Sequence, residues 1–295
     1  MATYYIATTG NDTTGDGSSS NPWLTLQHFL DNSADNDTLI VKDGTYTLTA
    51  NVAISQRTIQ AENNGLAIFD GGNTQISFIL GGTNLFTGLI FQRFYAITAS
   101  RGGIFNATQS EGATTWNNCT FKENRVAYTS SFARGAIFCS ENNLYTFNLN
   151  TCLLHSNYAS ASSATASGLF SVLATKTPGI DVNIVNTTIV QNITDGTEIQ
   201  NIFFNQGNDP YINVDIKNTI VYNAHTTSFN LVFNTDTITN FTTSYSDYYS
   251  VSDPNSPTII SGTGVITADP IFIDPANNNY NLSPSSPCID AGTLI

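Results

Sequence analysis

The chain has 295 residues, of which 40% are hydrophobic, enough to bury a sizeable core in one elongated domain or two ordinary ones. Only 11% are charged, and a net charge of −13 with nine Lys and Arg residues argues against nucleic acid and anionic membranes, since both bind clustered basic residues. No apolar run reaches about 18 residues, so we expect no membrane insertion.

The first 45 residues are interpreted as an N-terminal segment with one short helix. Its beginning, MATYYIATTGNDT, has neither a basic region nor an apolar stretch, so we expect no signal peptide. In NPWLTLQHFLDN, Asn21 suits a helix cap and Pro22 the first helical position, while Trp23, Leu26 and Leu30 share one face. The pattern predicts an amphipathic helix that covers the first coil.

Residues 46–250 contain two interleaved series of similar segments, each with a spacing of about 32 residues. The first series is GLIFQRF (88–94), NCTFKEN (118–124), CLLHSN (152–157), TTIVQN (187–192) and NTIVYN (218–223), and it aligns Phe91, Phe121, Leu154, Ile189 and Ile220. The second series aligns Ile104, Ile137, Leu169, Ile202 and Leu231. Two series with one period indicate a repeat protein.

Each repeat consists of short runs that alternate with period two, separated by polar turns. Such a unit cannot bury its own apolar face, so the repeats must stack with equivalent residues in ladders. Asn residues recur three positions after the aligned apolar residues, where they suit left-handed turns and coil-to-coil hydrogen bonds: Asn124, Asn157, Asn192 and Asn223. We predict a stack of roughly eight parallel coils rather than a β-sandwich.

Residues 251–295 hold many of the prolines, and proline cannot donate to a strand ladder. We therefore expect this segment to close the last coil. Its apolar cover would come from Ile271, Phe272, Ile273, Leu282 and Ile289. Its aspartates are expected to serve turns and caps rather than a ligand: Asp269, Asp274 and Asp290.

The repeats GGIF…NNCTFKEN and GAIF…NLNTCLLHSN resemble those of right-handed parallel β-helix proteins of the pectate-lyase-like superfamily. The segment ADPIFIDPANNNYNLSPSSPCIDAGT is similar to the one that closes many bacterial and phage β-helix proteins. The resemblance implies an all-β fold, a single right-handed parallel β-helix over residues 1–295. It divides into residues 1–45 with the capping helix, coils over 46–250, and a proline-rich cap over 251–295.

Enzymes of this superfamily are mostly polysaccharide lyases and hydrolases, which directs the search for a site. A lyase needs Arg or Lys on neighbouring coils to neutralise a substrate carboxylate and remove a proton. Lys122 and His155 align with Gln92 in one outward column, and Arg93 and Glu123 follow in the next, with equivalent positions ~5 Å apart. These residues are the catalytic candidates, and an ordinary polar face is the alternative explanation for them.

Other candidate contacts are equally open to structural explanations. Tyrosines in or beside turns offer stacking surfaces for sugars, or simply pack there: Tyr128, Tyr158, Tyr248 and Tyr249. We expect no cofactor and no metal ion. The alternative is that the acidic segments 11–16 and 31–37 bind Ca²⁺. Cys119, Cys139, Cys152 and Cys288 show no metal spacing and are expected to be buried thiols.

Three functions remain open. The first is a non-enzymatic structural component of a virion or an extracellular surface, such as a spike, fibre or decoration, that contacts cell-surface glycans and other virion or surface proteins. Spikes of this fold are often homotrimers. The second is a polysaccharide lyase or glycoside hydrolase. The third is a secreted bacterial adhesin whose signal sequence is absent from this chain.

Overall fold

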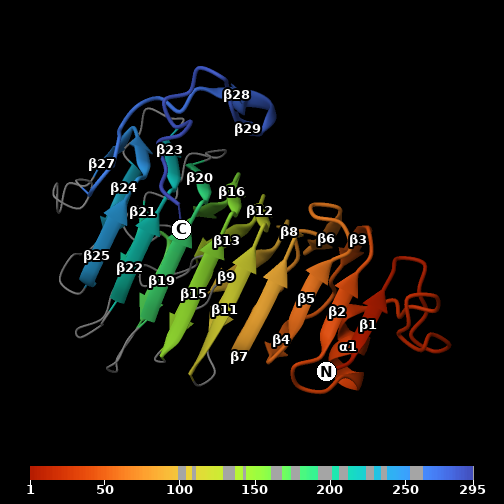
Figure 1. The fold of residues 1–295 in the computed structure, drawn as a ribbon. Coiled ribbons are helices and arrows are strands. Elements are labelled where there is room, and N and C mark those ends of the chain that lie inside the picture. The colour runs from red at the N-terminus through yellow and green to blue at the C-terminus, as the bar shows by residue number, and fades with distance from the viewer. Residues whose placement is uncertain are drawn as a thin grey trace.

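The computed structural model shows a right-handed parallel β-helix whose strands form three long faces (Figure 1). It describes residues 1–98, 104–107, 111–128, 137–141, 144–160, 168–173, 180–191, 201–205, 212–223, 229–233, 238–252 and 262–294. The backbone makes one strand per face in each coil, and neighbouring coils pair in parallel register. The all-β coil predicted from the repeats is therefore confirmed.

The first face is the longest, and its parallel ladder begins at the N-terminus. Its strands are β1 (Thr3–Ile6), β2 (Thr38–Val41), β5 (Thr58–Ala61), β7 (Phe78–Thr87), β11 (Gly112–Asn117), β15 (Tyr145–Asn150), β19 (Ile180–Val185), β22 (Ile212–Lys217) and β25 (Ile238–Ser244). Since β1 and β2 already pair with the coils, residues 1–45 contribute strands to the stack as well as a covering helix.

The second face contains eight strands, one for each coil that the repeat spacing predicted. They are β3 (Gly44–Thr47), β6 (Ala67–Asp70), β8 (Leu89–Gln92), β12 (Thr120–Lys122), β16 (Leu153–His155), β20 (Thr188–Gln191), β23 (Ile220–Asn223) and β26 (Asp247–Tyr249). Every pairing along this face is parallel.

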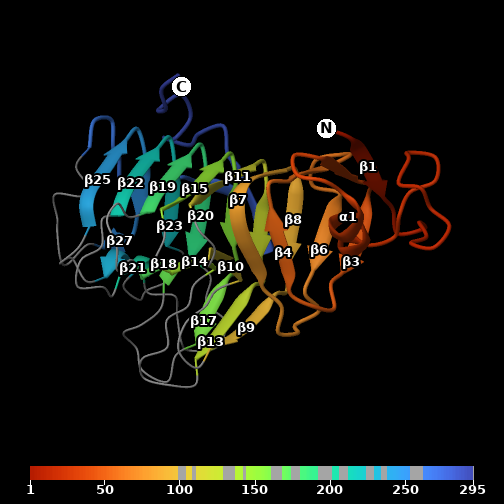
Figure 2. The same ribbon diagram turned by 90° about the horizontal axis from the view of Figure 1, so that it is seen from below.

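The third face shares β7 with the first, because β7 bends at Gly82, whose φ of +55° is unfavourable for other residues. Its other strands are β4 (Val52–Ser55), β10 (Phe105–Ala107), β14 (Phe138–Glu141), β18 (Gly168–Leu173), β21 (Asn201–Asn205), β24 (Phe229–Phe233) and β27 (Val251–Ser252). A small sheet of β9 (Tyr95–Thr98), β13 (Arg125–Tyr128) and β17 (Tyr158–Ser160) extends away from the body (Figure 2).

The core consists of aromatic stacks that run from coil to coil. Phe91 stacks on Phe121 with ring centroids 5.3 Å apart, and Phe105 stacks on Phe138 at 5.4 Å. Both stacks arise because equivalent inward positions of parallel strands carry the same residue type. The ladder predicted from the sequence is thus the hydrophobic core.

The predicted register holds for both series except at one step. Leu154 pairs with Ile189 as expected, but Ile189 pairs with Val221 rather than Ile220, so the last segment is shifted by one residue. Ile220 consequently points outward, which matters because a one-residue slip moves a side chain to the opposite face. The predicted amide stack is present at Asn124, whose Nδ2 donates to Asn157 Oδ1 at 2.9 Å; Asn192 lies outside the described residues.

The N-terminal helix begins later than predicted. Helix α1 spans Leu26–Asn32 with Thr25 as its N-cap, because Thr25 Oγ1 accepts from the His28 amide and Asp12 accepts from the Thr25 hydroxyl. Trp23, expected inside the helix, instead forms a β-bridge with Ile6.

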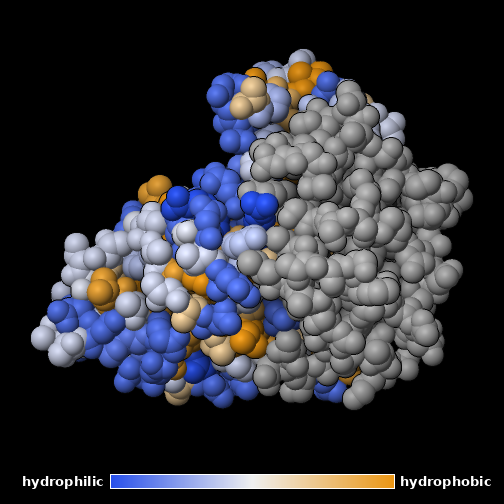
Figure 3. All heavy atoms as spheres, turned by 180° about the vertical axis from the view of Figure 1, so that it is seen from behind, coloured by the Kyte–Doolittle hydropathy of each residue, from blue (hydrophilic) through white to orange (hydrophobic). Residues whose placement is uncertain are grey.

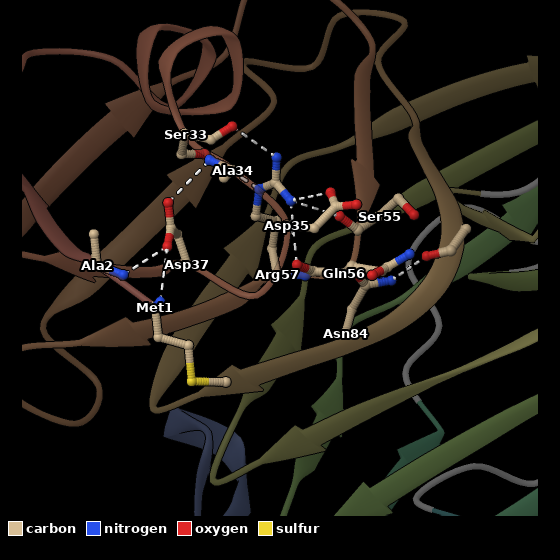
Figure 4. A network of polar contacts seen from close by, with 11 residues as sticks. Met1, Ala2, Ser33, Ala34, Asp35, Asp37, Ser55, Gln56, Arg57 and Asn84 are labelled. Atoms are coloured by element: carbon tan, nitrogen blue, oxygen red, sulfur yellow. Dashed lines mark hydrogen bonds and ion pairs between the residues drawn. The ribbon is translucent and has the colours of Figure 1, made fainter.

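A polar network fixes the N-terminal coils to one another (Figure 4). Asp37 accepts hydrogen bonds from the amides of Ala2 and Ala34, and Arg57 bridges Asp35 and the Ser33 carbonyl. These bonds attach the first strand and the loop after α1 to the next coil.

The C-terminal segment closes the last coil with its first described residues only. Ile266 bridges Asp247 in parallel and Val265 packs against the core. Residues 268–294, here called the C-terminal arm, instead turn back along the outside of the second face (Figure 1). The arm contains the antiparallel pair β28 (Phe272–Asp274) and β29 (Asn279–Leu282), joined by a 3₁₀ turn, η1 (Pro275–Asn277). Figure 3 shows it projecting from the body, with hydrophobic residues on its surface.

Most residues expected to cover the last coil are exposed. Ile271, Ile273 and Ile289 face solvent, and only Phe272 is buried. The aspartates behave as turn residues: Asp269 accepts from the Ile271 amide, Asp274 from the Asn277 side chain, and Asp290 has a φ of +57°.

Candidate functional site

The predicted strip of polar residues lies in register on the outer side of the second face. Lys122 of β12 pairs with Gln92 of β8 and with His155 of β16. The same column continues through Val190 and Tyr222 toward the C-terminal end. Lys122, His155 and Arg93 therefore lie together on one surface. Two of them already make contacts within the protein: Arg93 with Asp70 and His155 with Tyr280.

Arg93 is paired with Asp70, a residue that sequence reasoning missed. The guanidinium makes a bidentate contact with the buried Asp70 carboxylate, which also accepts from Gln92 Nε2 and the Gly72 amide. Burial opposes ionisation of Asp70, but these hydrogen bonds outweigh it and hold the carboxyl pKa below its usual range. The Arg93 charge is thus largely neutralised, although 44% of its side chain is exposed.

His155 lies beneath the C-terminal arm. It is 5% exposed, its ring centroid is 5.4 Å from that of Tyr280 in β29, and its Nδ1 is 3.0 Å from Ser156 Oγ. Burial, together with the charge of Lys122, lowers the His155 pKa to about 4. The imidazole is therefore neutral and covered at physiological pH.

Glu123 and Lys122 remain accessible. Glu123 is exposed at a turn with φ +55°, stacked between Arg93 at +53° and Ser156 at +52°, and Lys122 is half-buried. The strip thus offers one exposed carboxylate and one partly exposed ammonium group for external contacts.

The four tyrosines proposed to contact glycans differ in burial and contacts. Tyr248 is 1% exposed and its hydroxyl is 2.7 Å from Thr243 Oγ1, so it is a packing residue and the expectation of an exposed ring is corrected. Tyr249 is half-buried and stacks on Tyr222 at 5.5 Å. The side chains of Tyr128 and Tyr158 lie outside the described residues.

The arm covers an outer surface that is apolar near the C-terminal end. Phe272 contacts Tyr222 edge-on at 5.1 Å and Tyr280 at 5.4 Å. A signal for this cover exists in the sequence, because Leu153–Leu154 and 220–222 are consecutive apolar residues, and a strand with apolar residues on both sides is covered on both sides.

The outer side of the first face is polar and open. Chains of side-chain hydrogen bonds cross its strands: Asn183 Nδ2 donates to Asn148 Oδ1 at 2.8 Å, and Asn148 Nδ2 donates to Thr115 Oγ1 at 3.2 Å. Parallel contacts join Asn240 to Asn213, Asn213 to Asp181, Asn150 to Asn117, and Thr242 to Asp215. In each bond the later coil donates to the preceding one.

These ladders keep unused hydrogen-bonding capacity. An Asn side chain has two N–H donors and a carbonyl oxygen with two lone pairs, and each ladder bond uses one donor and one acceptor position. The face therefore presents fixed donors and acceptors at the interstrand spacing of ~4.8 Å. The register pairs Asp181 with Asn213 and Asp215 with Asn183, but the repeat pattern alone does not identify this ladder as a surface.

No metal or membrane site is evident in the part of the chain that the structure describes. Within those ranges, no group of three or more His, Cys, Asp or Glu side chains is placed to hold a metal ion. None of the described helices is long and apolar enough to cross a membrane. Cys119, Cys139 and Cys152 are buried as predicted, whereas Cys288 is half-buried in the arm.

Comparisons with known proteins bear only on the fold. No protein-family model and no curated protein sequence matches the chain. Among solved structures, it is similar to a rhamnogalacturonan lyase (TM-score 0.44, 14% identity, covering 86% of this chain and 75% of that one). It is also similar to the pectate lyase Pel9A (TM-score 0.45, 16% identity, 100% and 92%). A third likeness, to a variant of the PL6 family alginate lyase AlyGC, has a TM-score of 0.35 and 11% identity and covers 81% and 39%.

Proposed function

We propose that this chain is a non-catalytic β-helix whose first face binds an extended glycan, as a structural component of a virion or an extracellular surface. The supporting observation is the set of hydrogen-bonded amide, hydroxyl and carboxylate side chains that crosses β11, β15, β19, β22 and β25. Sugar hydroxyls both donate and accept, so they complement such a surface. A secreted adhesin would use the face in the same way.

Rigidity supports a binding role for this face. Each ladder side chain is held by its neighbour on the adjacent coil, so little rotamer entropy remains to be lost when a ligand binds. The ligand would be a chain long enough to contact several coils, because each polar contact to solvent-exposed groups adds little by itself.

Catalysis is the competing function, and one observation favours it. Arg93 and Lys122 lie on adjacent coils with part of each side chain accessible, as a lyase acting on uronates requires. The ion pair with Asp70 and the cover over His155 count against it. The lyase names of the similar structures define the substrates to assay first: pectate, rhamnogalacturonan and alginate.

One experiment separates the two functions. The protein is titrated with a panel of acidic and neutral polysaccharides, while binding is followed by calorimetry and the products by absorbance of unsaturated ends and by reducing sugar. We expect saturable binding to at least one polysaccharide without product. Product release that is lost in Arg93→Ala would establish the enzyme instead, and absence of binding across the panel would refute the glycan face.

A further inference from the structure

A cavity of about 220 Å³ separates the C-terminal arm from the last coils of the helix. On the helix side it is lined by Asn186, Thr188 and Asp247, and on the arm side by Leu282 and Cys288. Its volume is below the ~300–1,000 Å³ of pockets for drug-sized ligands, so it suits a small molecule.

Asp247 is an unusual residue for this place. It occupies the outward column of the second face in which the neighbouring coils carry Ile220, Thr188 and Leu153. The residue is only 2% exposed, and Cys288 Sγ donates to its Oδ2 at 3.2 Å. Its other oxygen, Oδ1, is buried and accepts no hydrogen bond from any described residue.

A buried carboxylate oxygen without a partner is costly, and such groups in native proteins call for a water, a proton or a ligand. None of the ion pairs in the described ranges includes Asp247. The titratable groups that act on it are Cys288 and Asp269, both on the arm. Asp269 adds a second negative charge, and burial raises the pKa of the Cys288 thiol to about 12, so the thiol stays protonated and donates.

Asp247 therefore has no positively charged partner among the described residues. Burial and the charge of Asp269 outweigh the Cys288 hydrogen bond and the backbone amides of Ala268 and Tyr248, and they raise the pKa of Asp247 to about 6. A positively charged donor beside Oδ1 would reverse this effect, because it pairs the anion and supplies the missing hydrogen bond.

We propose that the cavity binds the ammonium group of a small amine-bearing molecule, with Asp247 Oδ1 as the acceptor. Thr188 and Asn186 line the same space and provide polar groups for the remaining N–H donors, while Leu282 contacts the carbon skeleton. Binding of an ammonium ion to the protonated carboxyl gives the ion pair and releases one proton to solvent. The inference is independent of the glycan face, which lies on another side of the helix.

The test uses two ligands of one shape and different charge. Cyclohexylamine, which is protonated throughout, and cyclohexanol are each titrated calorimetrically into the intact protein at pH 5 and pH 7. We expect the amine to bind at least ~10-fold more tightly than the alcohol, since a hydrogen bond between charged groups contributes about 1.5–3 kcal/mol. Its affinity should rise by roughly 10-fold from pH 5 to pH 7 as the carboxyl no longer has to release a proton.

Variants assign the site. Asp247→Asn keeps the shape but removes the charge, and it should weaken amine binding by at least ~10-fold and abolish the pH dependence. Asp31→Asn makes the same charge change at an exposed position on α1 and should leave binding unaltered. Leu282→Trp fills the cavity without changing charge and should abolish binding, which keeps the test decisive if Asp247→Asn fails to fold.

Three outcomes would overturn the proposal. The first is no amine binding by the native protein at either pH, which would mean that the cavity holds water only. The second is equal affinity for amine and alcohol. The third is unchanged affinity in folded Asp247→Asn or in folded Leu282→Trp.

Discussion

The first and second faces of the helix are built by the same backbone but differ on their outer sides. The first face carries ladders such as Thr115–Asn148–Asn183 and remains open, whereas the second becomes apolar toward the C-terminal end and is covered by the arm. Because the parallel coil provides both faces with identical strand spacing, the side chains alone decide which face stays free for a ligand.

Removal of residues 268–295, which contain the arm, should produce the largest effect. It would uncover Tyr222, which contacts Phe272, and Leu153 and Ile220, which line spaces between the second face and the arm. A contiguous apolar patch promotes association. We expect aggregation, measured by size-exclusion chromatography with light scattering. A soluble, monodisperse truncated protein would show that the second face needs no cover.

Phe272→Ala should weaken docking of the arm, with a smaller effect than removal of the whole arm. The ring is 8% exposed and contacts Tyr222 and Tyr280, so its loss should destabilise arm docking by about 3 kcal/mol. Limited proteolysis within the arm measures this, with faster cleavage expected. Ile273→Ala, next in the chain but 56% exposed, is the matched control and should be nearly neutral; equal effects of the two substitutions would contradict the docked geometry.

The pH dependence of arm docking should identify the carboxyl beneath it. The Asp247 pKa is raised to about 6 in the folded protein from an ordinary value near 4, so the docked state favours the protonated form. Docking is therefore most stable below about pH 4 and weakens as the pH rises to 6, by roughly 1–2 kcal/mol after allowance for solvent screening. Proteolysis of the arm should accelerate from pH 4 to pH 6 in the absence of amines. Asp247→Asn should remove this pH dependence. A proteolysis rate in the native protein that does not change with pH relative to Asp247→Asn would contradict the burial of a carboxyl without a positively charged partner.

Much of this contrast could be predicted from the sequence, but not all of it. The coil, the two ladders and the Gln92–Lys122–His155 register follow from a repeat of fixed period, because equivalent residues must stack. The predicted register is wrong in its last step, where Val221 rather than Ile220 pairs with Ile189, because two consecutive apolar residues fit the same column equally well.

The position of the arm could not be predicted, because the contact between Tyr280 and His155 joins segments that share no repeat. The pairing of Asp70 with Arg93 was missed because the repeat was aligned only from residue 88 onward, although Asp70 stands in the same column as Gln92. Local periodicity determines the coils, whereas tertiary packing determines what covers them.

The smallest expected change in stability belongs to the open face. Asn148→Ala removes the hydrogen bond that Asn148 donates to Thr115 and the one that it accepts from Asn183. Because the side chain is accessible to solvent, the free energy of unfolding should fall by only about 0.5–1 kcal/mol, measured by thermal or denaturant unfolding. The same substitution should weaken binding of a polysaccharide that the native protein recognises by roughly 10-fold, since it interrupts the ladder at its centre. Asn281→Ala, an equally small change at an exposed position on the arm, should alter neither property. If Asn148→Ala destabilises the helix strongly and leaves glycan affinity intact, the ladder serves to hold the coils together, and the two faces differ in packing rather than in function.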